Sequence, residues 1–210
     1  MDEYSYKLDN FLFPLIFNIS KPNILELGVQ TGISTLKFLE ICNQNDGKLF
    51  SVDIINCSKV SNDHRWKFIK SRDDNFNYVK SEIPKSIDII YIDSLHEANH
   101  VKKIIYGYYD LLSVNGYLFV DDISHLPYLK NKQRNNFYCE INNHETFNKI
   151  LEIYDSNINS FDLNFSFVAS GLTIIKKKTN ARLNENQNIR TRKISLKNIA
   201  RLLWGNLKKD

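Results

Sequence analysis

The sequence predicts an α/β protein with a doubly wound, mostly parallel sheet of seven strands. Short apolar runs of strand character alternate with segments of helix length, which is typical of a parallel sheet covered by helices. Two further strand-like runs lie next to each other near the end of this pattern, and we expect them to form an antiparallel hairpin. A turn with two glycines follows the first run, at the point where such a sheet usually binds a ligand.

The elements can be assigned in order along the chain. Five strands are expected in the alternating part, at residues 23–27, 49–54, 66–69, 87–92 and 117–120. Helices are expected where apolar residues recur three or four positions apart, at residues 34–42, 101–112 and 147–154. The hairpin is expected from residues 161–168 and 172–175, with Gly171 at the turn. Residues 127–143 lie between the fifth strand and the last helix, and they could form a lid over a bound molecule or only a long surface connection.

The length of 210 residues fits one domain with a modest appendage. We interpret residues 1–21 as a packing segment, because the apolar run 11–17 is too short for a membrane span and contains Pro14. Residues 22–177 then form the catalytic domain, and residues 178–210 form a basic tail. The three cysteines are widely spaced and lack a C-x-x-C pair, which argues against a disulfide framework and structural zinc. A cytoplasmic location is expected from this cysteine usage.

The positive net charge of the chain comes from the tail. Residues 176–210 contain eleven Lys and Arg but only two acidic residues, which leaves residues 1–175 with 17 basic and 22 acidic residues. Because nucleic acid is bound by clustered basic side chains, the domain is not expected to bind RNA or DNA. Residues 194–207 could form an amphipathic helix. This helix could contact a membrane surface or a partner, or it could dock on its own protein or on the second subunit of a homodimer.

The glycine turn reads Glu26-Leu-Gly28-Val-Gln30-Thr-Gly32. A dinucleotide fingerprint needs glycine at the place of Gln30, so that the backbone can approach a pyrophosphate. The loop therefore suits a ligand without pyrophosphate. The order acidic-x-Gly-x-x-x-Gly resembles the first motif of the class I S-adenosylmethionine (SAM)-dependent methyltransferases. This resemblance implies SAM as the cofactor, with Glu26, Gly28, Gly32 and Ser34 as residues that bind it.

Two further aspartates are candidates for cofactor binding. Asp53 ends the second predicted strand, where a carboxylate can accept hydrogen bonds from two ribose hydroxyls. An ordinary strand-end or helix-capping aspartate is the alternative. The resemblance implies contact with adenine near the third strand, which favours Asp73, although a helix N-cap explains Asp73 or Asp74 equally well.

Three carboxylates are expected to meet at one rim of the cofactor crevice. Asp93 follows the fourth strand, whereas Asp121 and Asp122 follow the fifth, and adjacent strands lie about 4.8 Å apart. Mutual repulsion among these carboxylates requires a counter-charge, and Mg²⁺ prefers such oxygen ligands. We therefore predict Asp93, Asp121 and Asp122 as metal ligands, and Asp93 also as a contact to SAM. Neighbouring strand residues normally face opposite ways, so one of the pair could lie outside the metal's direct ligands.

Asp93-x-x-His96 followed by Asp121-Asp122 resembles the metal-associated small-molecule O-methyltransferases. Catechol-type and caffeoyl-CoA-type enzymes carry lysine at the place of His96, and the macrocin/cephalosporin-biosynthesis-like branch is closer. The implied reaction is Mg²⁺-assisted methylation of a hydroxyl on a small metabolite or sugar. His96 is the preferred general base, with Asp93 and His125 as alternatives. His96 could instead be a residue at the start of a helix that forms a hydrogen bond with the backbone.

Two other functions remain open. Methylation of nitrogen would normally require Asn/Asp-Pro-Pro-aromatic where this chain has Asp93-Ser-Leu-His96. A non-catalytic SAM-binding or scaffold protein would bind the cofactor but modify nothing. His64, His100 and His144 are expected to be surface or capping residues.

Overall fold

The computed structural model describes residues 2–125 and 137–185, together with residues 196–197, 199–200 and 204. The predicted tail helix and lid lie mostly outside these residues. Within the described residues, none of the helices has the length and apolar character needed to traverse a lipid bilayer.

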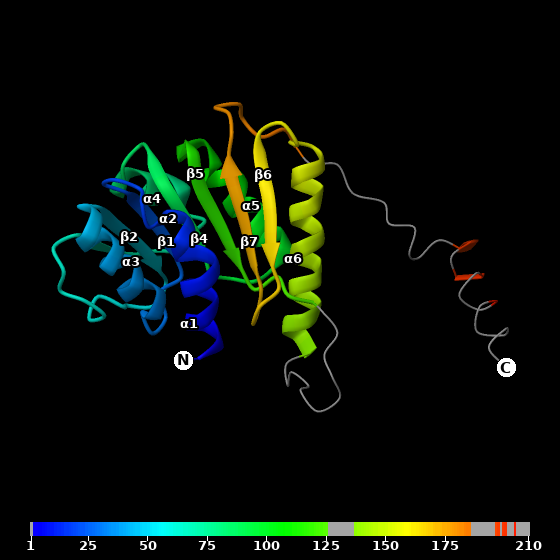
Figure 1. The fold of residues 1–210 in the computed structure, drawn as a ribbon, viewed down its shortest axis with the longest axis horizontal. Helices are drawn as coiled ribbons and strands as arrows, with labels where there is room; N and C mark the ends of the chain where they lie inside the picture. Colours follow the sequence, from blue (N-terminus) through cyan, green and yellow to red (C-terminus); the bar gives the residue numbers. More distant parts are fainter. Residues whose placement is uncertain (1, 126–136, 186–195, 198, 201–203, 205–210) are drawn as a thin grey trace.

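A seven-stranded sheet forms the centre of the molecule, with the order β3-β2-β1-β4-β5-β7-β6 (Figure 1). Its strands are β1 (Asn23–Leu27), β2 (Lys48–Asp53), β3 (Trp66–Lys70), β4 (Ile87–Ile92), β5 (Leu112–Asp121), β6 (Phe161–Ser166) and β7 (Leu172–Lys177). The first five strands are parallel, and β7 runs antiparallel to both β5 and β6. The predicted fold class is therefore confirmed, including the C-terminal hairpin.

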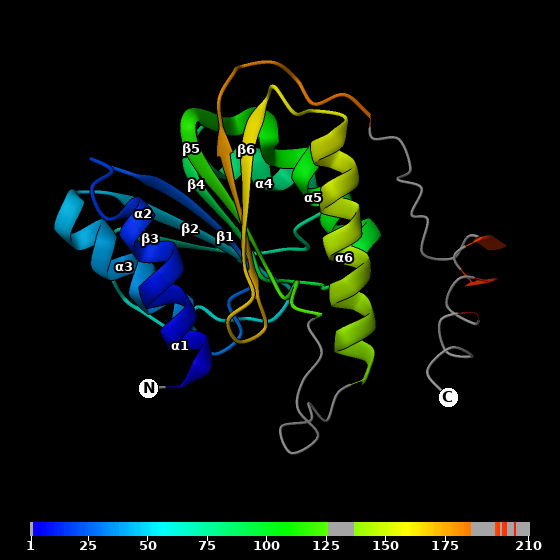
Figure 2. The same cartoon turned by 45° about the vertical axis from the view of Figure 1, so that its right-hand side comes forward.

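Helices cover both faces of this sheet (Figure 2). One face carries α4 (Phe76–Glu82), α5 (Ala98–Tyr108) with the short 3₁₀ turn η2 (Tyr109–Leu111), and α6 (Phe137–Asp155). The other face carries α3 (Ile33–Asn45) and the N-terminal elements α1 (Glu3–Lys7), η1 (Leu8–Leu12) and α2 (Phe13–Ile16). Helix α4 and the N-terminal helices were not expected from the sequence.

Side chains from alternate strand positions divide into two cores. Leu25, Ile90 and Ile92 pack with α4, α5 and α6, whereas Ile24, Ile89 and Tyr91 pack with α3 and the N-terminal elements. Because β1 and β4 are buried on both faces, their sequences are nearly continuous apolar runs without polar alternation.

The N-terminal elements contribute apolar side chains to one of the two cores. Leu8, Leu12 and Ile16 are fully buried against the sheet. Residues Leu8–Leu12 form a single π-helical turn that begins directly after Lys7. Such turns are rare and are found often at functional sites. The N-terminal segment also reaches the ligand crevice, since Tyr4 of α1 is among the residues that line it.

Candidate functional site

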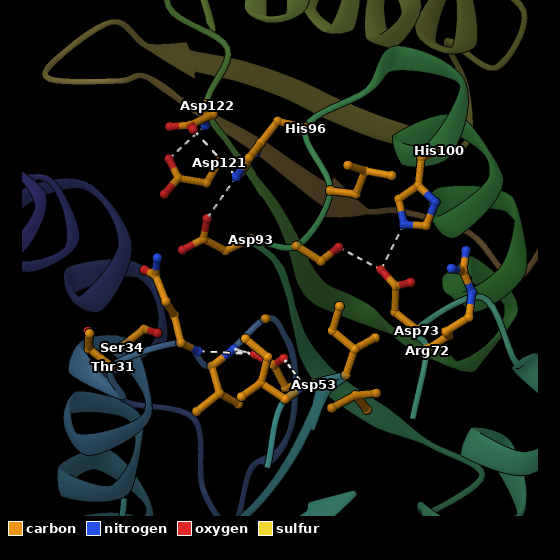
Figure 3. Close-up of a pocket in the computed structure, with 18 of the residues that line it drawn as sticks. Thr31, Ser34, Asp53, Arg72, Asp73, Asp93, His96, His100, Asp121 and Asp122 are labelled. Carbon is orange, nitrogen blue, oxygen red and sulfur yellow. Dashed lines mark hydrogen bonds and ion pairs between the residues drawn. The ribbon is translucent and has the colours of Figure 1, made fainter. Parts of the chain in front are cut away.

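A pocket of about 620 Å³ lies at the carboxyl ends of the parallel strands (Figure 3). Its lining comes from the glycine turn after β1 and from the residues that follow β2, β3, β4 and β5. This is the place where open α/β sheets bind ligands, and the volume is in the usual range for small-molecule sites.

The glycine turn forms one wall of the pocket and depends on both glycines. Gly28 has a φ of +101°, and a Cβ on it would lie 2.0 Å from the carbonyl oxygen of Asp93. Gly32 has a φ of +82°, and its Cβ would lie 2.3 Å from Cγ1 of Val60. The first glycine thus lets the turn pack against the end of β4, which brings the glycine turn and Asp93 together. No side chain would fit in that position.

Glu26 does not line the pocket, although the sequence analysis predicted it as a cofactor contact. Its carboxyl group is fully buried and accepts hydrogen bonds from the hydroxyls of Ser34 at 2.6 Å, Thr35 at 2.7 Å and Ser51 at 2.6 Å. Burial raises the pKa of Glu26 to about 7, although the three hydroxyl donors oppose that rise. The prediction that Glu26 contacts the cofactor is therefore corrected. Glu26 instead holds the start of α3 against β1 and β2, beneath the glycine turn. Ser34 does line the pocket.

Asp53 lines the pocket and braces the glycine turn. Its Oδ2 accepts hydrogen bonds from the backbone N–H groups of Val29 at 2.8 Å and Gln30 at 3.1 Å. Its Oδ1 accepts one from the N–H of Ile55 at 2.8 Å. A carboxylate oxygen has room for two donors, so Oδ1 can also accept from a ribose hydroxyl. Ribose binding by Asp53 stays a prediction. Independently of any ligand, Asp53 stabilises the glycine turn through its hydrogen bonds with Val29 and Gln30.

Asp73 also faces the pocket, on the side opposite Asp121 and Asp122 (Figure 3). Its Oδ2 is 2.5 Å from the Ser94 hydroxyl and 2.8 Å from Nε2 of His100. Burial opposes ionisation, but the hydrogen bonds from His100 and Ser94 outweigh it and lower the pKa of Asp73. Asn75 is the N-cap of α4, so the capping alternative for Asp73 does not hold. The prediction that His100 is a surface or capping residue is wrong, because its side chain is buried as the partner of Asp73 and the N-cap of α5 is Glu97.

Exposed aliphatic side chains line the same part of the pocket. Ile54 is 66% exposed and Leu95 is 47% exposed, and both belong to the lining. Large apolar groups at the mouth of a pocket usually contact a ligand, and a flat ring fits between two of them. The sequence analysis did not identify these residues, although Ile54 and Ile55 directly follow the predicted ribose contact.

The acidic rim forms where β4 and β5 end side by side. The parallel register pairs Ile92 with Val120, which places Asp93 next to Asp121. The Tyr91 hydroxyl donates to Oδ2 of Asp121 at 2.9 Å and lies 3.3 Å from Oδ2 of Asp93. The Tyr4 hydroxyl donates to the same Asp93 oxygen at 2.8 Å. The predicted meeting of these carboxylates is thus present, and Tyr4 is a contributor that the sequence analysis missed.

Lys7 is a second unexpected member of the acidic rim. Its ammonium forms an ion pair with Oδ1 of Asp121 and donates to the Ser170 hydroxyl at 2.7 Å. The side chains of Lys7 and Asp121 are 0% and 1% exposed. The ammonium also lies 4.9 Å from the centre of the Tyr4 ring, within cation–π distance. The N-terminal segment therefore supplies two side chains to the site in addition to its packing.

The predicted three-carboxylate magnesium site does not fit this arrangement. Both oxygens of Asp121 already have partners, Lys7 on one and Tyr91 on the other, and the side chain is buried. Across the residues that the structure describes, no group of three His, Cys, Asp or Glu side chains is placed to hold a metal ion. Asp93 and Asp122 keep pocket-facing oxygens, and His96 lies between them.

His96 lies between two carboxylates in Figure 3. Its Nε2 is 3.6 Å from Oδ1 of Asp93 and 3.5 Å from Oδ2 of Asp122. Asp122 has a φ of +59°, a left-handed conformation that aspartate tolerates, and both members of the acidic pair line the pocket. An imidazole in this position is within reach of a hydroxyl group bound in the pocket, and imidazole is a common proton acceptor.

His125 is not part of the pocket lining, so its predicted role as an alternative base does not fit. Its ring packs against His144, Phe147 and Phe167, with ring centres 4.7, 4.6 and 5.8 Å away. His125 therefore belongs to an aromatic cluster beneath the last strands.

The surroundings of Asp93 disfavour its ionised form. Burial and the adjacent charge of Asp121 raise the pKa of Asp93 well above its ordinary value, although the hydrogen bond from Tyr4 opposes this. Burial and the carboxylates of Asp121 and Asp93 likewise raise the pKa of Tyr91. The rim therefore keeps its tyrosines as hydrogen-bond donors.

Comparison with known proteins finds one family model and several solved structures that are similar to this chain. A family model described as a methyltransferase domain matches residues 25–123. A Staphylococcus aureus structure assigned as a caffeoyl-CoA O-methyltransferase has a TM-score of 0.61 and 20% identity, over 84% of each chain. The S-adenosylhomocysteine (SAH)-bound methyltransferase PaMTH1 of Podospora anserina has a TM-score of 0.61 and 17% identity, over 84% of this chain and 86% of its own.

A third similar structure is MycE, a methyltransferase of the mycinamycin biosynthetic pathway solved with Mg and SAH. It has a TM-score of 0.59 and 17% identity, over 90% of this chain and 55% of MycE. No curated protein matches the sequence. At these identities the solved structures show a shared fold.

Proposed function

We propose that this protein, whose residues 25–123 match a family model described as a methyltransferase domain, uses SAM to methylate a hydroxyl oxygen of a small metabolite or sugar. The observation that carries the proposal is the position of His96 between Asp93 and Asp122, on the rim of the same pocket that the glycine turn lines. This arrangement puts a proton acceptor beside the wall that the glycine turn forms.

When bound, SAM supplies a methyl group on a positively charged sulfur, which leaves as the neutral thioether SAH. The chain's own residues have two tasks in that reaction. The glycine turn, Asp53 and Asp73 hold the adenosyl part in place, so that the attack becomes effectively intramolecular. His96 accepts the hydroxyl proton at Nε2 as the new oxygen–carbon bond forms and the carbon–sulfur bond breaks.

The acidic character of the rim supports a neutral acceptor. Asp93 and Asp122 face the pocket, and residues 1–175 carry more acidic than basic residues. A phosphate backbone would be repelled by such a surface, whereas the hydroxyl of a sugar or phenol can donate a hydrogen bond to it. Solved structures of similar fold include methyltransferases that act on oxygen, by their assigned names.

The predicted assistance by Mg²⁺ has less support. Of the three predicted ligands, only Asp93 and Asp122 could contact an ion in the pocket, because Asp121 is already paired with Lys7. We therefore assign no step of the reaction to a metal. Contact of the basic tail with a membrane, a partner or a second subunit stays a prediction, since most of the tail lies outside the described residues.

Calorimetry with SAM and SAH, followed by a methyl-transfer screen, tests the proposal. We expect both compounds to bind, and we expect transfer to hydroxyl acceptors such as sugars and phenols. Transfer to amines only would favour the N-methyltransferase alternative. Binding of SAM without transfer to any acceptor of either class would favour the non-catalytic alternative. A well-folded protein that binds neither compound would refute the cofactor assignment.

A further inference from the structure

The ion pair between Lys7 and Asp121 is buried, and burying two charged groups destabilises a fold unless other interactions offset the desolvation. Removing an ammonium and a carboxylate from water carries a large desolvation penalty, which is offset only by good geometry and additional hydrogen bonds. Both side chains are at most 1% exposed. The contact also joins residues 114 positions apart in the sequence, across the floor of the acidic rim. A lysine that served only to pack the N-terminal segment would not need this partner.

The Lys7 ammonium has three contacts in the structure. They are the Asp121 carboxylate, the Ser170 hydroxyl at 2.7 Å and the face of the Tyr4 ring at 4.9 Å. Asp121 is equally occupied, since it accepts from the Tyr91 hydroxyl at 2.9 Å and from the N–H of Asp122 at 2.8 Å. The ammonium is therefore a fixed positive charge inside the acidic rim.

The position of Lys7 is fixed by the fold. Lys7 ends α1, the π-helical turn follows immediately, and Leu8, Leu12 and Ile16 anchor the segment in the core. Because this anchored segment holds the buried ammonium on Asp121, the ammonium competes directly with any ion that would bind Asp121.

We propose that Lys7 is the built-in cation of this site and that methyl transfer consequently needs no divalent metal ion. The proposal rests on the proposed function. Lys7 supplies the positive charge that three converging carboxylates require. A Mg²⁺ ion would need carboxylate oxygens at about 2.0–2.1 Å, and those of Asp121 are taken by Lys7 and Tyr91. Two adjacent cations would also repel each other.

Lys7 acts as a positioning residue, because it touches neither His96 nor the pocket. It holds Asp121, which accepts from Tyr91, and Tyr91 lies 2.9 Å from the Tyr4 hydroxyl that donates to Asp93. This network orients one oxygen of Asp93 toward the tyrosines and leaves the other toward His96. Loss of the ammonium leaves Asp121 as an uncompensated buried charge beside Asp93.

The first experiment measures the metal response of the unaltered protein. Methyl transfer is assayed after dialysis against EDTA and after addition of MgCl₂, and Mg²⁺ alone is titrated in a calorimeter. We expect the rate to change by less than about twofold and no Mg²⁺ to bind at the rim. Loss of transfer on chelation with recovery on Mg²⁺ would overturn the proposal. Stoichiometric Mg²⁺ binding that Asp122→Asn abolishes would overturn it too.

The second experiment replaces the charge. Lys7→Met keeps the length of the side chain and removes the ammonium, and we expect kcat to fall at least about tenfold. We also expect the thermal midpoint of this variant, unlike that of the unaltered protein, to rise with MgCl₂. Lys37→Met is the matched control, since Lys37 pairs with Asp9 between α3 and the N-terminal segment, outside the pocket. Equal losses in both variants, without a Mg²⁺ response, would show that Lys7 serves only to attach the segment.

A double variant covers the case in which Lys7→Met does not fold. Lys7→Met with Asp121→Asn removes both buried charges, so it should fold and bind SAH within about threefold of the unaltered protein. If this double variant is as unstable as the single one, the charge of Lys7 is not what the site needs. Failure of the unaltered protein to bind SAH would instead refute the proposed function, while the Mg²⁺ titration still decides the role of Lys7.

Discussion

Replacing Glu26 by glutamine should remove the loss of folding stability that ionisation of this buried carboxyl group causes as the pH rises from about 4.5 to 7. The carboxyl group is fully buried, and its pKa is raised from 4.5 to about 7. A raised pKa means that the folded protein binds this proton more tightly than the unfolded chain does. Glu26 therefore leaves stability intact below pH 4.5, and its ionisation lowers stability progressively as the pH rises from there to about 7.

The size of the effect follows from the two pKa values. One pKa unit corresponds to about 1.4 kcal/mol, so ionisation of Glu26 should cost the folded state about 3 kcal/mol at pH 9. The glutamine of the variant does not titrate, and its amide can still meet the hydroxyls of Ser34, Thr35 and Ser51. The variant should therefore gain about 3 kcal/mol relative to the unaltered protein between pH 5 and pH 9.

Urea unfolding followed by circular dichroism at pH 5, 6, 7, 8 and 9 measures this difference directly. Any constant cost of the amide cancels, because only the change with pH is compared. Glu40→Gln is the control, since Glu40 is an exposed residue of α3, the helix whose Ser34 and Thr35 bind Glu26, and its difference should stay flat. If the Glu26→Gln difference is equally flat across this range, the buried carboxyl does not titrate between these pH values.

Three further changes test the pocket. Gly28→Ala should abolish SAH binding in calorimetry, because its Cβ would lie 2.0 Å from the Asp93 carbonyl oxygen at a φ of +101°; binding within about threefold of normal would show that the turn can move. His96→Gln should lower kcat by about 10²–10⁴-fold while the Kd for SAH changes little, and an unchanged kcat in steady-state assays would remove His96 as the base. His100→Ala removes a hydrogen bond that lowers the pKa of Asp73, so acid should weaken SAH binding at a higher pH than in the unaltered protein; coincident binding curves between pH 4 and 7 would contradict this.

The sheet and the acidic rim could be predicted from the sequence because both follow from local pattern. Apolar runs separated by helical spacing determine a parallel sheet, and the carboxyl ends of its strands must share one edge. Asp93 and Asp121 therefore had to meet once their two strands were adjacent. The same reasoning located the glycine turn and Asp53 at this edge.

The direction of individual side chains was harder to predict. Glu26 lies in a strand buried on both faces, so alternation gave no sign that it pointed beneath the pocket. His100 was dismissed because its partner, Asp73, is 27 residues away and belongs to another loop. Contacts between distant segments leave no periodic trace in the sequence.

Lys7 and Tyr4 show the same limit most clearly. The N-terminal segment was recognised as apolar, but its polar residues had no visible partners within the sequence near them. An imbalance of charge in the predicted site could have indicated Lys7. Three carboxylates are predicted to converge there, and the neighbouring strand ends provide no basic residue. A counter-charge from elsewhere in the chain was the alternative to a metal ion.

The place of β7 in the sheet determines when this site can form during synthesis. Strand β7, the last of the sheet to be made, pairs with β5 on one side and β6 on the other, and Ser170 precedes it in the connecting turn. Until those residues leave the ribosome, β5 keeps an unpaired edge and Lys7 lacks one of its hydrogen-bond partners. A nascent chain that has released only about its first 160 residues therefore carries an aggregation-prone open edge, and the two ends of the domain must meet before the site is complete.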